Sequence, residues 1–355
     1  MSVKTTLCAT RTFTHVDRVP RGEGLKPAMY PIDSTGRDAR LDIARGIAIL
    51  LVVVGHAMDG AQNLAGWNRP MTALLVFIYT FHVASFFAVS GFLSRSLMER
   101  SWPEFMRILG VRIVWPYALW GTILMGIHFG LSQYTNTKLL SFAPWTLLWK
   151  PASVTWFLYA LFLAMILLKA LTGRPVWIIL ATGVGLVVAS YTIPSPLYLR
   201  FIGVFVLASQ LDQTLLDRLL TRNMLRICGI TMLGTAAFAW QNAAMSTTGF
   251  PGLKFVFLPA LFAGPLLLLG LCDWMERRQV SRKICAILAL LGRRSMPIFL
   301  THILFTAGAR ITLTALGIES ISLVILLGVT AGVGIPLAAS EIARRTRVSV
   351  ILGWR

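Results

Sequence analysis

The chain has 355 residues, of which 56% are hydrophobic and 13% are charged, and its net charge is +19. Soluble domains carry about 25% charged residues, so the composition excludes an ordinary soluble protein. Long apolar runs throughout the chain instead predict an all-α, polytopic membrane protein. The basic residues lie between these runs and form no aromatic-rich surface, which excludes nucleic acid as a partner.

Residues 1–40 are polar and include seven Lys and Arg, which predicts a largely disordered, basic cytoplasmic tail. We expect a ten-helix membrane domain over 41–339 and a short basic cytoplasmic tail over 340–355. The ten predicted spans are about 41–58, 71–94, 111–129, 154–170, 176–191, 197–211, 224–240, 253–272, 295–315 and 319–339. After the second predicted span, four arginines (Arg95, Arg100, Arg107 and Arg112) flank a short connection around Trp102 and Pro103. Pro116 is expected to bend the third span.

The distribution of basic residues predicts the orientation. If the N-terminus is cytoplasmic, 26 of the 33 Lys and Arg lie in cytoplasmic segments and six in outer loops, with Arg45 inside the first span. This asymmetry repeats at every crossing, so we expect both termini in the cytoplasm. Arg310 counts here among the six outer residues.

The first span carries three ionisable residues, Asp42, Arg45 and His56. An α-helix turns about 100° per residue, so the eleven steps from Arg45 to His56 bring both to nearly the same face, about 16 Å apart along the axis. Asp42 lies within about 60° of that face. Ionisable residues inside a span are costly and mark functional sites. The alternative is that Asp42 and Arg45 are interfacial charges and that His56 caps the helix.

His82 in the second span and His302 in the ninth lie at similar predicted depth to His56. Three histidines from three helices would line one cavity if those helices pack together, although buried histidines are also common hydrogen-bonded helix contacts. We expect His128 and His15 to be incidental. The four cysteines form no paired motif, and few acidic residues lie in the spans, so no metal site is expected.

Four segments resemble the membrane acyltransferase-3 family and occur in the family's order. They read RLDIARGIAILLVVVGHA over 40–57, FIYTFHVASFFAVSGFL over 77–93, TWFLYALF over 155–162 and LLGRRSMPIFLTHILF over 290–305. The first contains the family's Arg and His separated by ten residues. The second is similar to the branch that includes fucose 4-O-acetylase and the O-acetyltransferases of exopolysaccharide and O-antigen. Here Val83 and Ala84 stand where the family has Met-Pro.

The resemblance implies an O-acetyltransferase of the bacterial inner membrane. It would move an acetyl group from cytoplasmic acetyl-CoA, a co-substrate rather than a bound cofactor, to a hydroxyl of a cell-surface or lipid-linked polysaccharide. A histidine suits the role of base near neutral pH, and arginines suit coenzyme A phosphates. The implied catalytic residues are His56, Arg45 and Asp42. The implied residues for binding acyl-CoA or acceptor are His82, Ser90, Arg107, Arg112, Trp156 and His302.

Three points stay open from the sequence. The acyl group passes either directly to the acceptor or through an acyl-histidine intermediate. The sequence indicates acetyl-CoA, the acceptor glycan and membrane lipids as partners and indicates no others. It does not indicate the oligomeric state. The alternative functions are a transporter or flippase of a lipid-linked sugar or small anion, and a structural subunit of a glycan-assembly complex. The sequence shows no internal repeat of the kind that many transporters have.

Overall fold

The structure is a computed structural model that describes residues 38–65, 68–132, 141–192, 198–242, 254–278 and 280–354. Residues 1–37 of the predicted disordered tail lie outside the described residues. Residues 39–355 form one compact unit.

The protein is an all-α, polytopic membrane protein, as predicted. The first half contains α1 (Ala39–Ala65), α2 (Arg69–Phe92), α3 (Arg95–Met98), α4 (Trp102–Leu109), the π-helix η1 (Gly110–Val114), α5 (Trp115–Gly130), the 3₁₀ turns η3 (Pro144–Leu148) and η4 (Ser153–Thr155), α6 (Trp156–Ala170) and α7 (Val176–Thr192). The second half contains α8 (Leu199–Ala208), α9 (Gln213–Leu219), α10 (Arg222–Gln241), the 3₁₀ turn η6 (Lys254–Phe257), α11 (Leu258–Arg277), α12 (Arg282–Arg293), α13 (Ser295–Ala315), α14 (Ile321–Arg345) and α15 (Val348–Ile351).

Helices occupy all ten predicted spans, but not all ten are long and apolar enough to cross a membrane by themselves. Within the described residues, seven helical segments meet that criterion. A further pair, α8 and α9, meets it only together and is bent by 110°. The helix α7 is apolar but only 17 residues long, and α10 is not among the seven. The total of ten spans and the cytoplasmic placement of both termini stay predictions.

The third span differs from its predicted form. The helix begins at Trp102 and continues to Gly130 as one segment, so Arg107 lies on a helix and not in a connection, and Arg112 lies within the helix as its predicted span implies. Pro116 has no backbone N–H and cannot pair with the carbonyl of Arg112. The chain accommodates it with the π-helical turn Gly110–Val114, in which the N–H of Trp115 donates to the carbonyl of Gly110.

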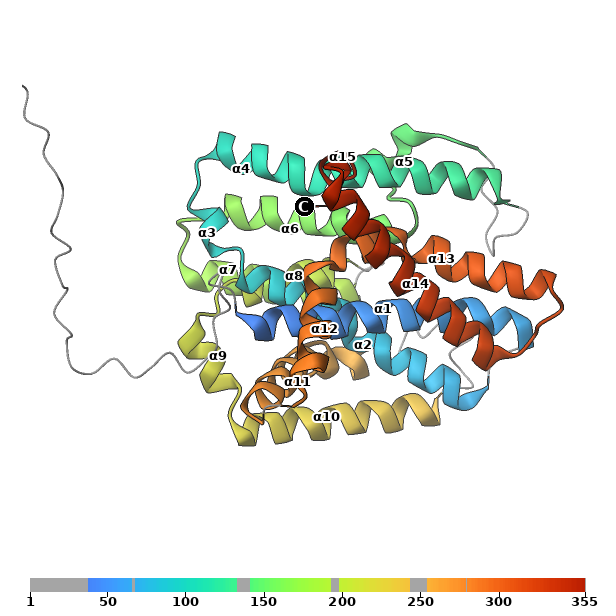
Figure 1. Ribbon diagram of the computed structural model, residues 1–355. Coiled ribbons are helices and arrows are strands. Elements are labelled where there is room, and N and C mark those ends of the chain that lie inside the picture. Colours follow the sequence, from blue (N-terminus) through green and yellow to red (C-terminus); the bar gives the residue numbers. More distant parts are fainter. Residues whose placement is uncertain are drawn as a thin grey trace, which may run out of the picture. The chain divides into compact units, whose positions relative to one another are not determined.

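The first helix, α1, lies in the middle of the unit and contacts α2, α11, α12, α13 and α14. Figure 1 shows α10 and the α4–α5 segment on opposite sides of it. The crossing with α12 is very close, because a Cβ at Gly46 would lie 1.9 Å from the carbonyl oxygen of Leu288. A Cβ at Gly292 would lie 1.8 Å from the carbonyl oxygen of Asp42. Small residues let membrane helices approach this closely, and here they fix α1 against α12.

An aromatic cluster joins α2, α6, α8 and α13. The ring of Phe157 lies 4.9 Å from that of Phe87 and 5.0 Å from that of Phe299, and Phe201 stacks on Phe87 at 5.6 Å, measured between centroids. Aromatic pairs at such separations stabilise beyond their buried area. At the other end of the chain, α14 continues past the predicted domain limit at 339 to Arg345, and Trp354 stacks on Trp120 at 5.6 Å.

Candidate active site

The beginning of α1 carries a buried carboxylate between two guanidinium groups. Asp42 is 6% exposed, and its oxygens lie 4.0 Å from a nitrogen of Arg45 and 3.8 Å from a nitrogen of Arg293 at the end of α12. The close approach at Gly292 places that end of α12 beside Asp42. Because a buried carboxylate favours paired cations, Asp42 holds Arg45 and Arg293 together at this end of the bundle.

Three turns further along α1, His56 meets His302 of α13. The two ring centroids are 5.2 Å apart. His302 is completely buried, and its Nδ1 donates to the carbonyls of Phe299 at 2.8 Å and Ile298 at 3.1 Å. Since carbonyls only accept, Nδ1 carries the proton and Nε2 carries a lone pair. Among the described residues, that buried Nε2 has no hydrogen-bond partner.

His82 joins the same region through Tyr79. The ring of Tyr79 lies 5.1 Å from His82 and 6.4 Å from His56. Gly55 makes room for it, because a Cβ at that position would lie 2.6 Å from the Tyr79 ring. The Nδ1 of His82 donates to the carbonyl of Ile78 at 2.7 Å, which fixes its tautomer as in His302. Tyr79 thus lies between His82 and His56, but of the three predicted histidines only His56 is among the residues that line the adjoining cavity.

The face of α1 between Arg45 and His56 is apolar and closed. Ile49 and Val52 occupy it, and their exposed fractions are 0% and 3%. They pack with Ile298 of α13 and against Phe86 and Phe299. Arg45 and His56 therefore lie at the two ends of a row of buried apolar side chains on α1, which we call the seam. Its length is about half the thickness of the hydrocarbon core of a membrane.

A cavity of about 450 Å³ adjoins His56. It lies between α1, α5 and α13, and the partly exposed His56 forms part of its wall. Ionisable side chains of Asp59, His128 and Arg310 also line it, together with Ser153. Its size suits a small ligand, and its wall includes His56, Asp59 and His128, whose side chains are capable of proton transfer.

The other predicted binding residues lie away from this cavity wall. Arg107 and Arg112 are exposed on α4 and η1. Trp156 packs on Phe201 at 5.7 Å between ring centroids, within the aromatic cluster. Ser90 is half-buried beside Gly91, where a Cβ would lie 2.2 Å from the carbonyl oxygen of Phe205, so this part of α2 serves close packing with α8.

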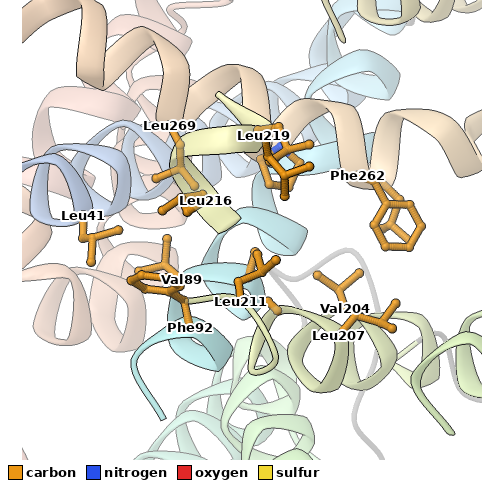
Figure 2. A pocket seen from close by; sticks show the side chains of 15 residues that line it. Leu41, Val89, Phe92, Val204, Leu207, Leu211, Leu216, Leu219, Phe262 and Leu269 are labelled. Carbon is orange, nitrogen blue, oxygen red and sulfur yellow. The ribbon is translucent and has the colours of Figure 1, made fainter. Parts of the chain in front are cut away.

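A second cavity, of about 230 Å³, lies near the beginning of α1 between α2, α8, α9 and α11. Figure 2 shows its lining, in which Leu41, Val89 and Leu216 are among the labelled side chains. All the residues that line it are apolar, so it offers no group for proton transfer. The cavity beside His56 is therefore the candidate active site.

Sequence reasoning missed three residues of this site. Tyr79 lies one helical turn before His82 on α2. His128 was expected to be incidental, and Arg310 was counted as an outer-loop residue, but α13 includes it. His302, Thr306 and Arg310 follow at intervals of four on a largely apolar helix. That polar stripe was the available signal, because residues four apart share a helix face.

The fold and this site define a polytopic membrane protein with a histidine-centred cavity inside its helical bundle. The family model for the acyltransferase-3 family, described as "Acyltransferase domain", matches residues 38–340. The chain therefore belongs to this family of membrane acyltransferases, as the sequence motifs predicted.

Two curated proteins are similar to part of the chain. The nodulation protein NolL of Mesorhizobium japonicum is 28% identical over 176 residues, which is 46% of this chain and 44% of that protein. The nodulation protein NolL of Sinorhizobium fredii is 26% identical over 178 residues, 47% of this chain and 46% of that protein. The matched part thus spans less than half the length of either relative. No solved structure matches the chain.

Proposed function

We propose that the protein is an O-acetyltransferase of the bacterial inner membrane. It transfers an acetyl group from cytoplasmic acetyl-CoA to a hydroxyl of a cell-surface or lipid-linked polysaccharide. Membership of the acyltransferase-3 family supports acyl transfer. The observation that carries the proposal is that His56, which lines a cavity, meets His302. His56 also lies on the same face of α1 as Arg45.

In this proposal His56 is the general base. It takes the proton of the acceptor hydroxyl while the oxygen attacks the carbonyl carbon of the thioester. The carbon–sulfur bond then breaks, and the departing thiolate of coenzyme A takes the proton back from the imidazolium. A base of this kind typically contributes about 10²–10⁴-fold in rate. The lone pair of His302 Nε2, which is buried and has no hydrogen-bond partner among the residues that the structure describes, accepts a hydrogen bond from His56 or from substrate.

Arg45 and Arg293 provide the positive charge for the phosphates of coenzyme A at the other end of the seam, and Asp42 positions Arg45. The separation of about 16 Å between Arg45 and His56 is comparable to the reach of an extended pantetheine arm. The seam between them is filled by Ile49 and Val52, so donor binding must displace side chains that pack there.

The proposal is tested by acetyl-CoA turnover in the detergent-purified full chain. We expect His56→Ala to lower the rate at least about 100-fold. Arg45→Ala should raise the KM for acetyl-CoA, because it removes a charge-assisted contact. Thr330→Ala, which changes an exposed side chain on α14, is the control and should turn over like the wild type. Full activity of His56→Ala, or no turnover by the wild type, would overturn the proposed function.

A further inference from the structure

Within the part of the chain that the structure describes, no salt bridge joins the arginine of the candidate active site to a carboxylate. Arg310 is half-buried on α13 and lines the cavity beside His56. Among the described residues, no ion pair or hydrogen bond involves its guanidinium group. An arginine within a membrane span is costly unless something pairs with it, so such residues mark ligand sites.

The nearby carboxylate does not fill this role. Asp59 lines the same cavity, but among the described residues no salt bridge joins it to Arg310, and its Oδ1 instead accepts a hydrogen bond at 2.7 Å from Nε2 of Gln62, one turn along α1. Arg310 instead lies beside Gly60 of α1. A Cβ at Gly60 would lie 3.5 Å from Nε of Arg310, so the guanidinium stem rests against the bare backbone of α1.

The same contact places the arginine about one helical turn from His56 along α1. Gly60 follows His56 by one helical turn, which corresponds to about 6 Å along α1. That length is comparable to the width of one sugar ring. A ligand with its hydroxyl at His56 would therefore present the far side of the same sugar, or its neighbour, to Arg310.

From these contacts we infer that the cavity binds an acceptor with an anionic group, a carboxylate or a phosphate, about one sugar unit from the acylated hydroxyl. Arg310 pairs with that anion, and the planar guanidinium suits either group. The inference rests on the proposed function and adds to it the chemical class of the acceptor. Arg310 is then a specificity-determining residue, because a neutral acceptor would leave its charge unpaired.

The test measures binding by titration calorimetry to the full chain in lipid nanodiscs. The probes are methyl β-D-glucuronide, its neutral counterpart methyl β-D-glucoside, and inorganic pyrophosphate. We expect at least one of the two anions to bind about tenfold or more tightly than the glucoside, as expected for a charge-assisted hydrogen bond in a partly buried site. Arg310→Gln should abolish that preference.

The matched control is Arg69→Gln, which removes a charge from an exposed arginine that donates to the carbonyls of Trp240 and Gln241 and lies outside the cavity lining. It should retain the preference, and thermal unfolding should show that both variants are folded. Tighter binding of the glucuronide assigns the anion to a uronate sugar, and tighter binding of pyrophosphate assigns it to the phosphate of a lipid-linked acceptor.

Equal affinity of the wild type for charged and neutral probes would overturn the inference. So would failure to bind any probe, or an anion preference that survives Arg310→Gln. The outcome is separable from that of the proposed function, which depends on acetyl-CoA turnover by the wild type. Anion binding that needs Arg310 in a protein without such turnover would refute the acetyltransferase proposal and leave the anion site in place.

Discussion

The crossing of α1 and α12 at Gly46 provides a quantitative test of how the site is positioned. A Cβ at Gly46 would lie 1.9 Å from the backbone carbonyl oxygen of Leu288, and ordinary contacts begin at 3.4 Å. Backbone atoms cannot rotate away as a side chain can. In Gly46→Ala the two helices must therefore separate by about 1.5 Å at this point in a close-packed interior.

Two opposing terms set the change in the free energy of unfolding. Alanine favours a helix over glycine by about 1 kcal/mol, and overpacking of a close contact costs about 1–3 kcal/mol. Gly334→Ala, in the middle of α14, is the matched control because nothing lies within 4 Å of a Cβ there. The helix-propensity term is common to both variants, so Gly46→Ala should be less stable than Gly334→Ala by about 1–3 kcal/mol.

The assay is thermal unfolding of the detergent-purified variants, followed by acetyl-CoA turnover below the melting temperature. We expect the melting temperature of Gly46→Ala to lie at least about 2 °C below that of Gly334→Ala. Its turnover should also fall, since α1 carries both Arg45 and His56. Equal melting temperatures for the two variants would refute the close crossing and the reasoning built on it.

Two further changes test the parts of the site. His302→Leu removes the lone pair beside His56 and should lower kcat for acetyl transfer about tenfold or more, with little change in the KM for acetyl-CoA, as measured by steady-state kinetics. An unchanged kcat would separate His302 from the chemistry. Asp42→Asn removes the charge between Arg45 and Arg293 and should raise the KM for acetyl-CoA about tenfold. Glu104→Gln, which removes an exposed carboxylate paired with Arg100, should leave that KM unchanged, and equal KM values for the two variants would refute the role of Asp42.

The sequence alone determined those features that depend on residues close together in the chain. Apolar runs predicted the all-α membrane fold, because a span needs about 20 apolar residues in succession. The eleven-residue spacing of Arg45 and His56 predicted their common face, since helical geometry fixes it. Pro116 predicted a bend in the third span, which stays a prediction, and neither the π-helical turn Gly110–Val114 nor the helical continuation back to Trp102 was predicted.

Only the tertiary structure decided which of these faces meet. The contact between His56 and His302 joins residues on α1 and α13, and it depends on the way α1 packs between its neighbours. The same packing brings Tyr79 beside His56 and places His128 and Arg310 in one cavity wall. Helical periodicity says which side chains share a face of one helix. It does not say which helix covers that face, because helix pairing is set by backbone approach at residues such as Gly46 and Gly292.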